Sequence, residues 1–144
     1  MALTNQITVL TQYIVDRLTT SKTSLGLKDI FYGDQELIPR YPAVAVDSVS
    51  KERELAGLPF RTDNNFTILL LVYHAQISNT AVTRKSCDEF AEAIELNLHD
   101  DTTMGGNVIH GYVTMMESGF AVRGGSQLRA TRITWSGYSK TNIG

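Results

Sequence analysis

Residues 65–75, "NFTILLLVYHA", constrain the fold more than any other part of the chain. Their apolar side chains follow the two-residue period of a β-strand, and they do so on both faces. One face carries Phe66, Ile68, Leu70 and Val72, and the other carries Leu69, Leu71 and Tyr73. A strand that is apolar on both sides must be covered on both sides. We expect helices to cover one face, and a second layer or another subunit to cover the other.

The remaining elements follow from hydrophobic periodicity. Apolar residues at spacings of three and four predict a helix at about residues 4–20 and a second at about residues 80–99. Alternating patterns predict further strands, which are residues 43–49, 108–122 and 127–138, with extended structure beginning at residues 27–31. The order is α-β-β-α-β-β. It predicts an α+β fold with a mostly antiparallel sheet and two main helices packed on one face.

The 144 residues are expected to form a single domain, residues 1–144. One segment departs from the periodic pattern. Residues 50–64, "SKERELAGLPFRTDN", are charged and contain Gly57 and Pro59. We expect them to form a protruding loop, and long loops of this kind are often functional.

The stretch "FYGDQELIPRYPAVAV" brings Asp34, Glu36 and Arg40 close together in the sequence. A hydrolytic pair of carboxylates needs a concave site to which several elements contribute, and no other segment supplies one. The glycine and the prolines instead favour a turn followed by extended backbone. We interpret the stretch as a structural corner that directs the strand beginning at Ala43.

The chain offers few residues for catalysis. Cys87 falls on the apolar stripe of the second predicted helix, and no G-x-S-x-G motif is present to activate a serine. The best metal candidate is the cluster of His99, Asp100, Asp101 and His110, but no histidine pair has i, i+4 spacing. We predict that the protein is not an enzyme and has no catalytic, metal or cofactor-binding residues. A small metal-binding enzyme that uses this cluster is kept as an alternative.

Charge is distributed unevenly along the chain. Residues 84–101 contain two basic and six acidic side chains, whereas residues 117–140 contain four basic and one acidic. The net charge of −2 argues against a surface built for non-specific nucleic-acid binding. The simpler interpretation of this segregation is two solvated faces, and the alternative is that copies of the chain meet head to tail, acidic surface to basic surface, and close a ring.

Several segments resemble, in order and type, small virion proteins at the head–tail junction of tailed bacteriophages. Those that carry the resemblance are "FYGDQELIPRYPAVAVDSVSKERELAG", "NNFTILLLVYHA", "RKSCDEFAEAIE", "LHDDTTMGGNVIHGYVTMMESGF" and "LRATRITWSGYSK". They span most of the chain and are similar above all to the tail terminator group. They are patterns of turn, strand and helix, and not ligand signatures.

The resemblance implies a viral structural protein that forms a ring, a homohexamer, on the last ring of tail-tube subunits. The ring would stop tube polymerisation and join the tail to the head during virion assembly. Its partners would be copies of itself, the tail tube protein, the neck or head-closure protein and, in a contractile tail, the sheath protein. Double-stranded DNA would pass through the lumen without specific binding. The alternative is a head-closure or neck connector protein between portal and tail.

Such a ring would belong to the tail or neck of the virion and would be assembled in the host cytoplasm. The lone cysteine fits a reducing compartment. The first residues show no basic region followed by a long apolar core, so we expect no signal peptide. No membrane partner is expected, because the longest apolar run is the six residues "ILLLVY".

Two groups of side chains are predicted to contact neighbouring proteins. The first is a protein interface formed by Lys51, Glu52, Arg53, Glu54, Leu55, Leu58, Phe60, Arg61, Arg123 and Arg129. Its mixture of charged and apolar residues suits a protein contact. The second group lies on the second predicted helix and comprises Asp88, Glu89, Glu92 and Glu95. These carboxylates are candidates either for an acidic lumen, on which DNA would slide without sticking, or for the ring interface.

Overall fold

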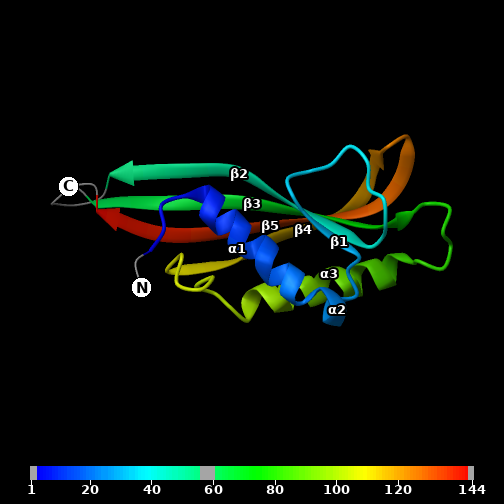
Figure 1. The fold of residues 1–144 in the computed structure, drawn as a ribbon, viewed down its shortest axis with the longest axis horizontal. Helices are drawn as coiled ribbons and strands as arrows, with labels where there is room; N and C mark the ends of the chain where they lie inside the picture. Colours follow the sequence, from blue (N-terminus) through cyan, green and yellow to red (C-terminus); the bar gives the residue numbers. More distant parts are fainter. Residues whose placement is uncertain (1–2, 56–60, 143–144) are drawn as a thin grey trace.

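A computed structural model describes residues 3–55 and 61–142, and the side chains at positions 61 and 142 are not described. Five strands form one sheet in the order β1-β2-β3-β5-β4, and the two main helices pack on one face of it (Figure 1). This arrangement confirms the predicted α+β class with a mostly antiparallel sheet. None of the helices in the described ranges is long and apolar enough to cross a membrane.

The elements in chain order are α1 (Ile7–Thr20), α2 (Lys22–Leu25), β1 (Asp29–Tyr32), β2 (Ala43–Leu55), β3 (Arg61–Gln76), α3 (Arg84–His99), β4 (His110–Arg123) and β5 (Ser126–Asn142). The predicted order α-β-β-α-β-β lacks the short helix α2, and it does not count the four-residue strand β1, which lies where extended structure was expected to begin. Both are too short to show a period of their own. The predicted strands at residues 108–122 and 127–138 are present as β4 and β5, and they form a hairpin whose register ends at the pair Arg123–Ser126.

Two hairpins, β2–β3 and β4–β5, meet where β3 pairs with β5 at the centre of the sheet. All three contacts are antiparallel, and only β1 runs parallel to its neighbour, β2. Helix α3 connects the hairpins after β3 and lies on the same face as α1 (Figure 1). Its start is fixed by a capping box, in which Thr83 and Ser86 each bond the backbone N–H of the other.

The main core lies between this face of the sheet and the helices. Strand β3 contributes one of its two predicted apolar faces to this core. The side chains of this face, which are all fully buried, are Phe66, Ile68, Leu70 and Val72. The helices contribute one stripe each, which comprises Leu10, Ile14 and Leu18 from α1 and Ala91, Ile94 and Leu98 from α3. Trp135 of β5 is also fully buried in this cluster. The predicted stripes therefore do face the sheet.

The opposite face of the sheet has only a small core. Residues 33–42, the cyan loop above β1 in Figure 1, cover the end of β3 near Tyr73 and bury Ile38 against it. Leu69 and Leu71 stay partly exposed on this face. On the face where a second layer or another subunit was expected, a loop therefore covers one part. The rest of this face is not covered by the described residues of the single chain.

The prediction of a loop over residues 50–64 is wrong for most of its length. Strand β2 continues to Leu55 and β3 begins at Arg61, and their register runs without interruption from Ser50–Thr67 to Leu55–Thr62. The strand was not predicted because its charged residues show no alternation of apolar and polar side chains. Pairing with β3, which provides the backbone hydrogen bonds, nevertheless holds these residues in a strand. Residues 56–60, which include Leu58, lie outside the described residues.

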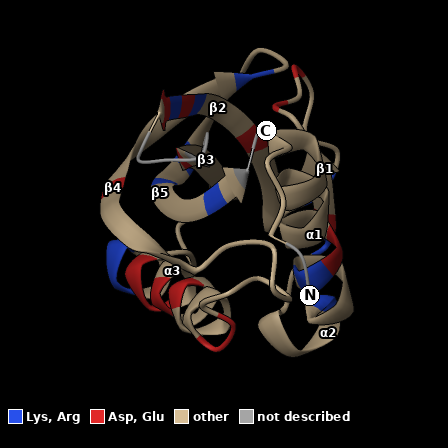
Figure 2. Ribbon diagram, turned by 90° about the vertical axis from the view of Figure 1, so that its left-hand side faces the viewer, with Lys and Arg blue, Asp and Glu red and all other residues tan. Residues whose placement is uncertain are grey.

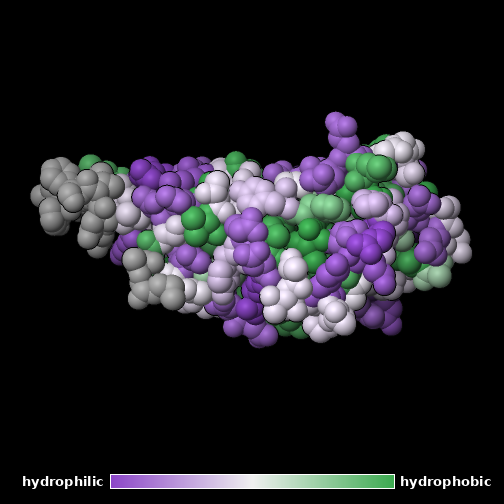
Figure 3. Space-filling model, in the orientation of Figure 1, coloured by the Kyte–Doolittle hydropathy of each residue, from purple (hydrophilic) through white to green (hydrophobic). Residues whose placement is uncertain are grey.

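Residues 50–55, 61–67 and 136–142 form the outer end of the sheet, where β2, β3 and β5 continue past the helices (Figure 1). The start of β4, residues 110–112, pairs only with residues 136–138 of this end. We call this outer end the arm. It protrudes from the body of the molecule, as the loop was expected to do, but it is a regular part of the sheet. The hydrophobic surface on the face shown in Figure 3 forms separate patches among hydrophilic residues.

Candidate protein interface

The arm sorts its charges by face. Lys51, Arg53 and Leu55 pair in register with Phe66, Asn64 and Thr62, and Phe66 belongs to the core under the helices. Because residues directly opposite each other in a sheet share a face, these three side chains lie on the helix side. We call Lys51, Arg53 and Leu55 the basic face of the arm.

The opposite face of the arm is acidic. Glu52 pairs with Asn65, and Glu54 pairs with Asp63. In Figure 2 the two signs appear as alternating blue and red bands along β2. A register shift between Ser48 and Ser50 produces this arrangement. The extra residue reverses the alternation, so the basic side chains, and not the acidic ones, continue the core face of β2.

Buried polar contacts hold the arm in shape. Asn64 is fully buried, and its amide group accepts a hydrogen bond from Arg53 Nε at 3.2 Å and donates one to Thr141 Oγ1 at 2.9 Å. The Ser139 hydroxyl, also fully buried, donates to the backbone carbonyl of Thr4. The N-terminal segment is thereby tied to the arm, and the strands present their charges on a fixed surface.

The two cations of the basic face have no carboxylate partner within the described part of the chain. Neither Lys51 nor Arg53 has an ion pair there. Burial, with the nearby Arg53 charge, lowers the pKa of Lys51. Two like charges held side by side without a counter-ion favour the approach of an external anion. Leu55, 64% exposed, completes this face with apolar surface.

A second surface lies between α3 and β4. A groove of about 410 Å³ is lined by Glu92, Glu95, Leu96, Val113, Thr114, Met115 and Met116. We call it the acidic groove. Its apolar part is prominent, because Leu96 is 67% exposed and Met115 is 53% exposed. Figure 2 shows the acidic residues gathered along α3.

The four predicted carboxylates of α3 divide into two pairs. Asp88 and Glu89 have partners within the helix, Arg84 at 3.7 Å and Lys85 at 4.0 Å. Asp88 also accepts a hydrogen bond from the Ser118 hydroxyl. Glu92 and Glu95, in contrast, have no ion pair with any described residue. These two are the carboxylates that border the groove.

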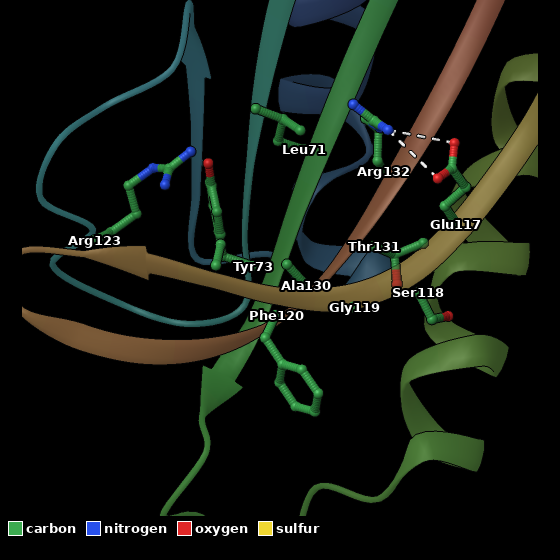
Figure 4. A pocket seen from close by; sticks show the side chains of 11 residues that line it. Leu71, Tyr73, Glu117, Ser118, Gly119, Phe120, Arg123, Ala130, Thr131 and Arg132 are labelled. Carbon is green, nitrogen blue, oxygen red and sulfur yellow. Dashed lines mark hydrogen bonds and ion pairs between the residues drawn. The ribbon is translucent and has the colours of Figure 1, made fainter.

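The open face of the sheet contains a shallow pocket of about 250 Å³ (Figure 4). Its positive charges are neutralised from within. Arg123 binds the Asp34 carboxylate at 2.5 Å. Arg132 lies 3.4 Å from Glu117, and the dashed lines in Figure 4 mark this contact. The pocket therefore lacks the free cations that an anionic ligand would need.

The predicted interface residues are thus distributed over several places. Arg123 is bound to Asp34, so it serves the corner at residues 33–42. Arg129 stacks over the Phe120 ring at 5.8 Å, on the opposite side of the sheet from Arg132. Phe60 lies outside the described residues, and of Arg61 only the backbone is described, in β3. The part of the predicted interface that comes together is residues 51–55.

The candidate metal cluster is not assembled. His99 Nε2 accepts a hydrogen bond from the Val113 amide at 3.0 Å, and His110 stacks on Tyr138. Asp101 accepts hydrogen bonds from the Tyr13 hydroxyl and the Gly105 amide. Within residues 3–55 and 61–142, no three histidine, cysteine, aspartate or glutamate side chains are arranged to hold a metal ion.

The corner prediction fits the contacts. Arg40 pairs with Asp29, Asp34 pairs with Arg123, and Glu36 is exposed, so the three residues do not form one site. The sequence reasoning missed the two-faced arm. The signal was present in "KEREL", where the sign of charge alternates with the period of a strand.

No protein-family model matches the sequence, and no characterised protein is significantly similar to it.

Proposed function

We propose that this protein is a structural subunit of a tailed bacteriophage, a tail terminator that forms a ring on the end of the tail tube. The observation that carries the proposal is the arm, a rigid part of the sheet that extends beyond the helices with unpaired charges and exposed leucine (Figure 1). A surface of this kind is suited to contact with another protein. The resemblance to tail terminators gives the contact its biological setting.

Two unpaired sheet edges support an assembling subunit. Strand β4 forms one edge of the sheet along residues 110–123, and β2 has no outer partner beyond Val46 among the described residues. Exposed strand edges favour pairing with other chains. Because the two edges belong to different strands, a contact between one edge and the other is head-to-tail, and such contacts close into rings.

In this role the ring caps the last tube ring, stops tube polymerisation and presents a docking surface to the neck. Copies of the chain, the tube protein, the neck or head-closure protein and, in a contractile tail, the sheath protein are the proposed partners. DNA passes through the lumen without specific contacts. The hexameric stoichiometry rests on the resemblance alone.

Deletion of the gene from the phage tests the proposal. Particles that lack a terminator should contain tails of excessive length that are detached from filled heads, visible by negative-stain electron microscopy. Complementation with the wild-type gene should restore tails of uniform length. Tails of normal length beside heads that have lost DNA would instead identify a head-closure protein, and normal infectious particles would exclude both roles.

A further inference from the structure

The basic face of the arm and the acidic groove are complementary in charge. The arm presents two cations, Lys51 and Arg53, and the groove presents two carboxylates, Glu92 and Glu95. None of the four has an ion pair within the described part of the chain. Other charges on the described surface do have partners within the chain, as Arg84 has in Asp88 and Arg132 has in Glu117. Other described charges, such as Glu52 and Glu54, also lack an ion pair, but these four form two separate surfaces of opposite sign, each with exposed apolar side chains beside it.

The two surfaces also match in their apolar parts. Leu55 is exposed at the end of the basic face, and the groove presents Leu96 and Met115. Exposed leucine and methionine side chains next to unpaired charges are typical of an interface, with an apolar centre and a charged rim. A methionine adapts its shape to an incoming side chain.

The geometry requires the two surfaces to meet between different copies. The arm is fixed by its pairing with β3 and β5, whereas the groove lies between α3 and the far edge strand, β4 (Figure 1). Strands β3 and β5 lie between β2 of the arm and β4 of the groove, and their continuous pairing keeps an arm from bending back to its own groove. A contact between different patches of identical subunits is heterologous, and its repetition closes a ring at a suitable rotation.

We propose that the basic face of the arm of one copy docks into the acidic groove of the next copy. Leu55 then lies against Leu96 and Met115, while the cations pair with the two carboxylates at the rim. The inference rests on the proposed ring-forming function and names the surface by which neighbouring subunits recognise each other. It also assigns Glu92 and Glu95 to the interface and not to the lumen.

Reversal of charge on each surface tests the contact. The double variants Lys51→Glu/Arg53→Glu and Glu92→Lys/Glu95→Lys should each weaken self-association at least tenfold, measured by native mass spectrometry and light scattering over a range of concentrations. A mixture of the two variants should co-assemble with the two chains alternating, and a chain that carries all four changes should assemble again. The rescue is expected because an acidic arm then meets a basic groove, so that attraction replaces the repulsion between like charges.

The matched control is the other face of the same strand. Glu52→Lys/Glu54→Lys changes charge by the same amount at neighbouring positions of β2 and should leave assembly unchanged. If both double variants assemble like the wild type, or if the four-change chain is not rescued, the docking model is wrong. Circular dichroism spectra equal to that of the wild type show that each variant is folded.

Cross-linking gives a second readout that does not depend on strong association. In a Cys87→Ser background, a chain with both Leu55→Cys and Leu96→Cys should form a ladder of covalent multimers on mild oxidation. An equal mixture of chains that carry one change each should stop at the dimer. The control combination Val9→Cys with Leu96→Cys, which uses an exposed site on α1, should give no ladder.

The outcomes separate this inference from the function on which it rests. Overlong tails in the deletion phage, together with charge variants that assemble normally, would overturn the docking model and leave the terminator role intact. If the wild-type chain does not assemble and the double-cysteine chain forms no ladder, even with tail-tube protein present, the docking model is wrong. If the four-change chain assembles again but the deletion phage has normal tails, the contact is supported and the terminator role is contradicted.

Discussion

The indole ring of Trp135 lies directly against the backbone of Gly111 on the neighbouring strand β4. A Cβ atom on Gly111 would be 1.9 Å from Cζ2 of this ring, and one on Gly137 would be 2.4 Å from Cη2. Trp135 is fully buried. The two glycines therefore provide the space in which the largest side chain of the core fits.

Gly111→Ala should lower the free energy of unfolding by about 1–3 kcal/mol, because the indole must move in a closely packed core. The measurement is urea unfolding followed by the fluorescence of Trp135, the single tryptophan of the chain. Gly119→Ala on the same strand is the control, since its Cβ meets no atom within 4 Å. The control should differ from the wild type by less than about 0.5 kcal/mol. Equal losses in both variants would contradict the packing argument.

Asp34 joins the corner loop to the sheet. Partial burial opposes its ionisation, but hydrogen bonds from Arg123 and Tyr73 outweigh this and hold the pKa of Asp34 below its usual value. Asp34→Asn should lower the free energy of unfolding by about 1 kcal/mol, a modest loss because the pair is partly exposed. Amide hydrogen exchange in residues 33–42 should become faster.

The same pair predicts a dependence on acid. A carboxyl group with a lowered pKa stabilises the folded state at neutral pH, and this contribution is lost as pH falls below the ordinary aspartate pKa. Asp34→Asn should therefore flatten the stability curve in that range. Glu36→Gln, two residues away and exposed, is the control and should leave both stability and exchange unchanged.

His74 predicts a second dependence on pH, at higher values. Burial lowers the pKa of His74 to about 4, and the nearby Asp88 carboxylate only partly opposes this. Between about pH 6.5 and 4, the unfolded chain binds a proton that the folded protein does not, so stability falls as pH falls. The loss attributable to this side chain should reach about 3 kcal/mol across the window.

The measurement is urea unfolding of the wild type and of His74→Gln between pH 4 and 7. A glutamine can keep a hydrogen bond to Thr131, the partner of the imidazole at 2.8 Å. The variant should lose less stability on acidification. His110→Gln, at an exposed position of β4, should follow the wild-type curve. Parallel curves for the wild type and His74→Gln would show that the folded protein takes up this proton readily.

Cys87 should be protected from thiol reagents. It is 4% exposed on the inner face of α3, and burial raises the pKa of its thiol. Labelling at pH 8 should be at least about 100-fold slower in the native protein than in urea, because the reaction needs local opening and a thiolate. Lys85→Cys, at an exposed position of the same helix outside the acidic groove, should add one thiol that reacts at once. Rapid labelling of both thiols would contradict the packing of α3.

The sequence predicted best those elements whose period is set by burial. Strand β3 and helix α3 carry apolar residues at positions that their local geometry directs to the core. Strand β1 was harder to predict, because its four residues are stabilised by parallel pairing with β2 and not by a pattern of their own. The outer part of β2 was hardest, since its residues alternate in charge and not in hydrophobicity.

The interface was predicted in composition but not in arrangement. Residues 51–55 were identified by their mixture of charge and leucine, but their division between two faces depends on a bulge at residues 48–50. Arg123 was assigned to the same interface, although it contacts Asp34, 89 positions earlier in the chain. A pairing over that separation depends on tertiary structure, which a local pattern does not contain.

The continuity of β3 and β5 also determines how the molecule carries force. Their register runs from Arg61–Asn142 at the tip of the arm to Gln76–Leu128 in the body, and its single shift, between Tyr73 and Ala75, lies at the far end from the arm. Interstrand hydrogen bonds in an antiparallel pair are perpendicular to the strands, so a pull along the arm loads many of them in shear at once. Tension applied at the tip is thus transmitted to the helix-covered core through a stiff ladder, with no hinge in between.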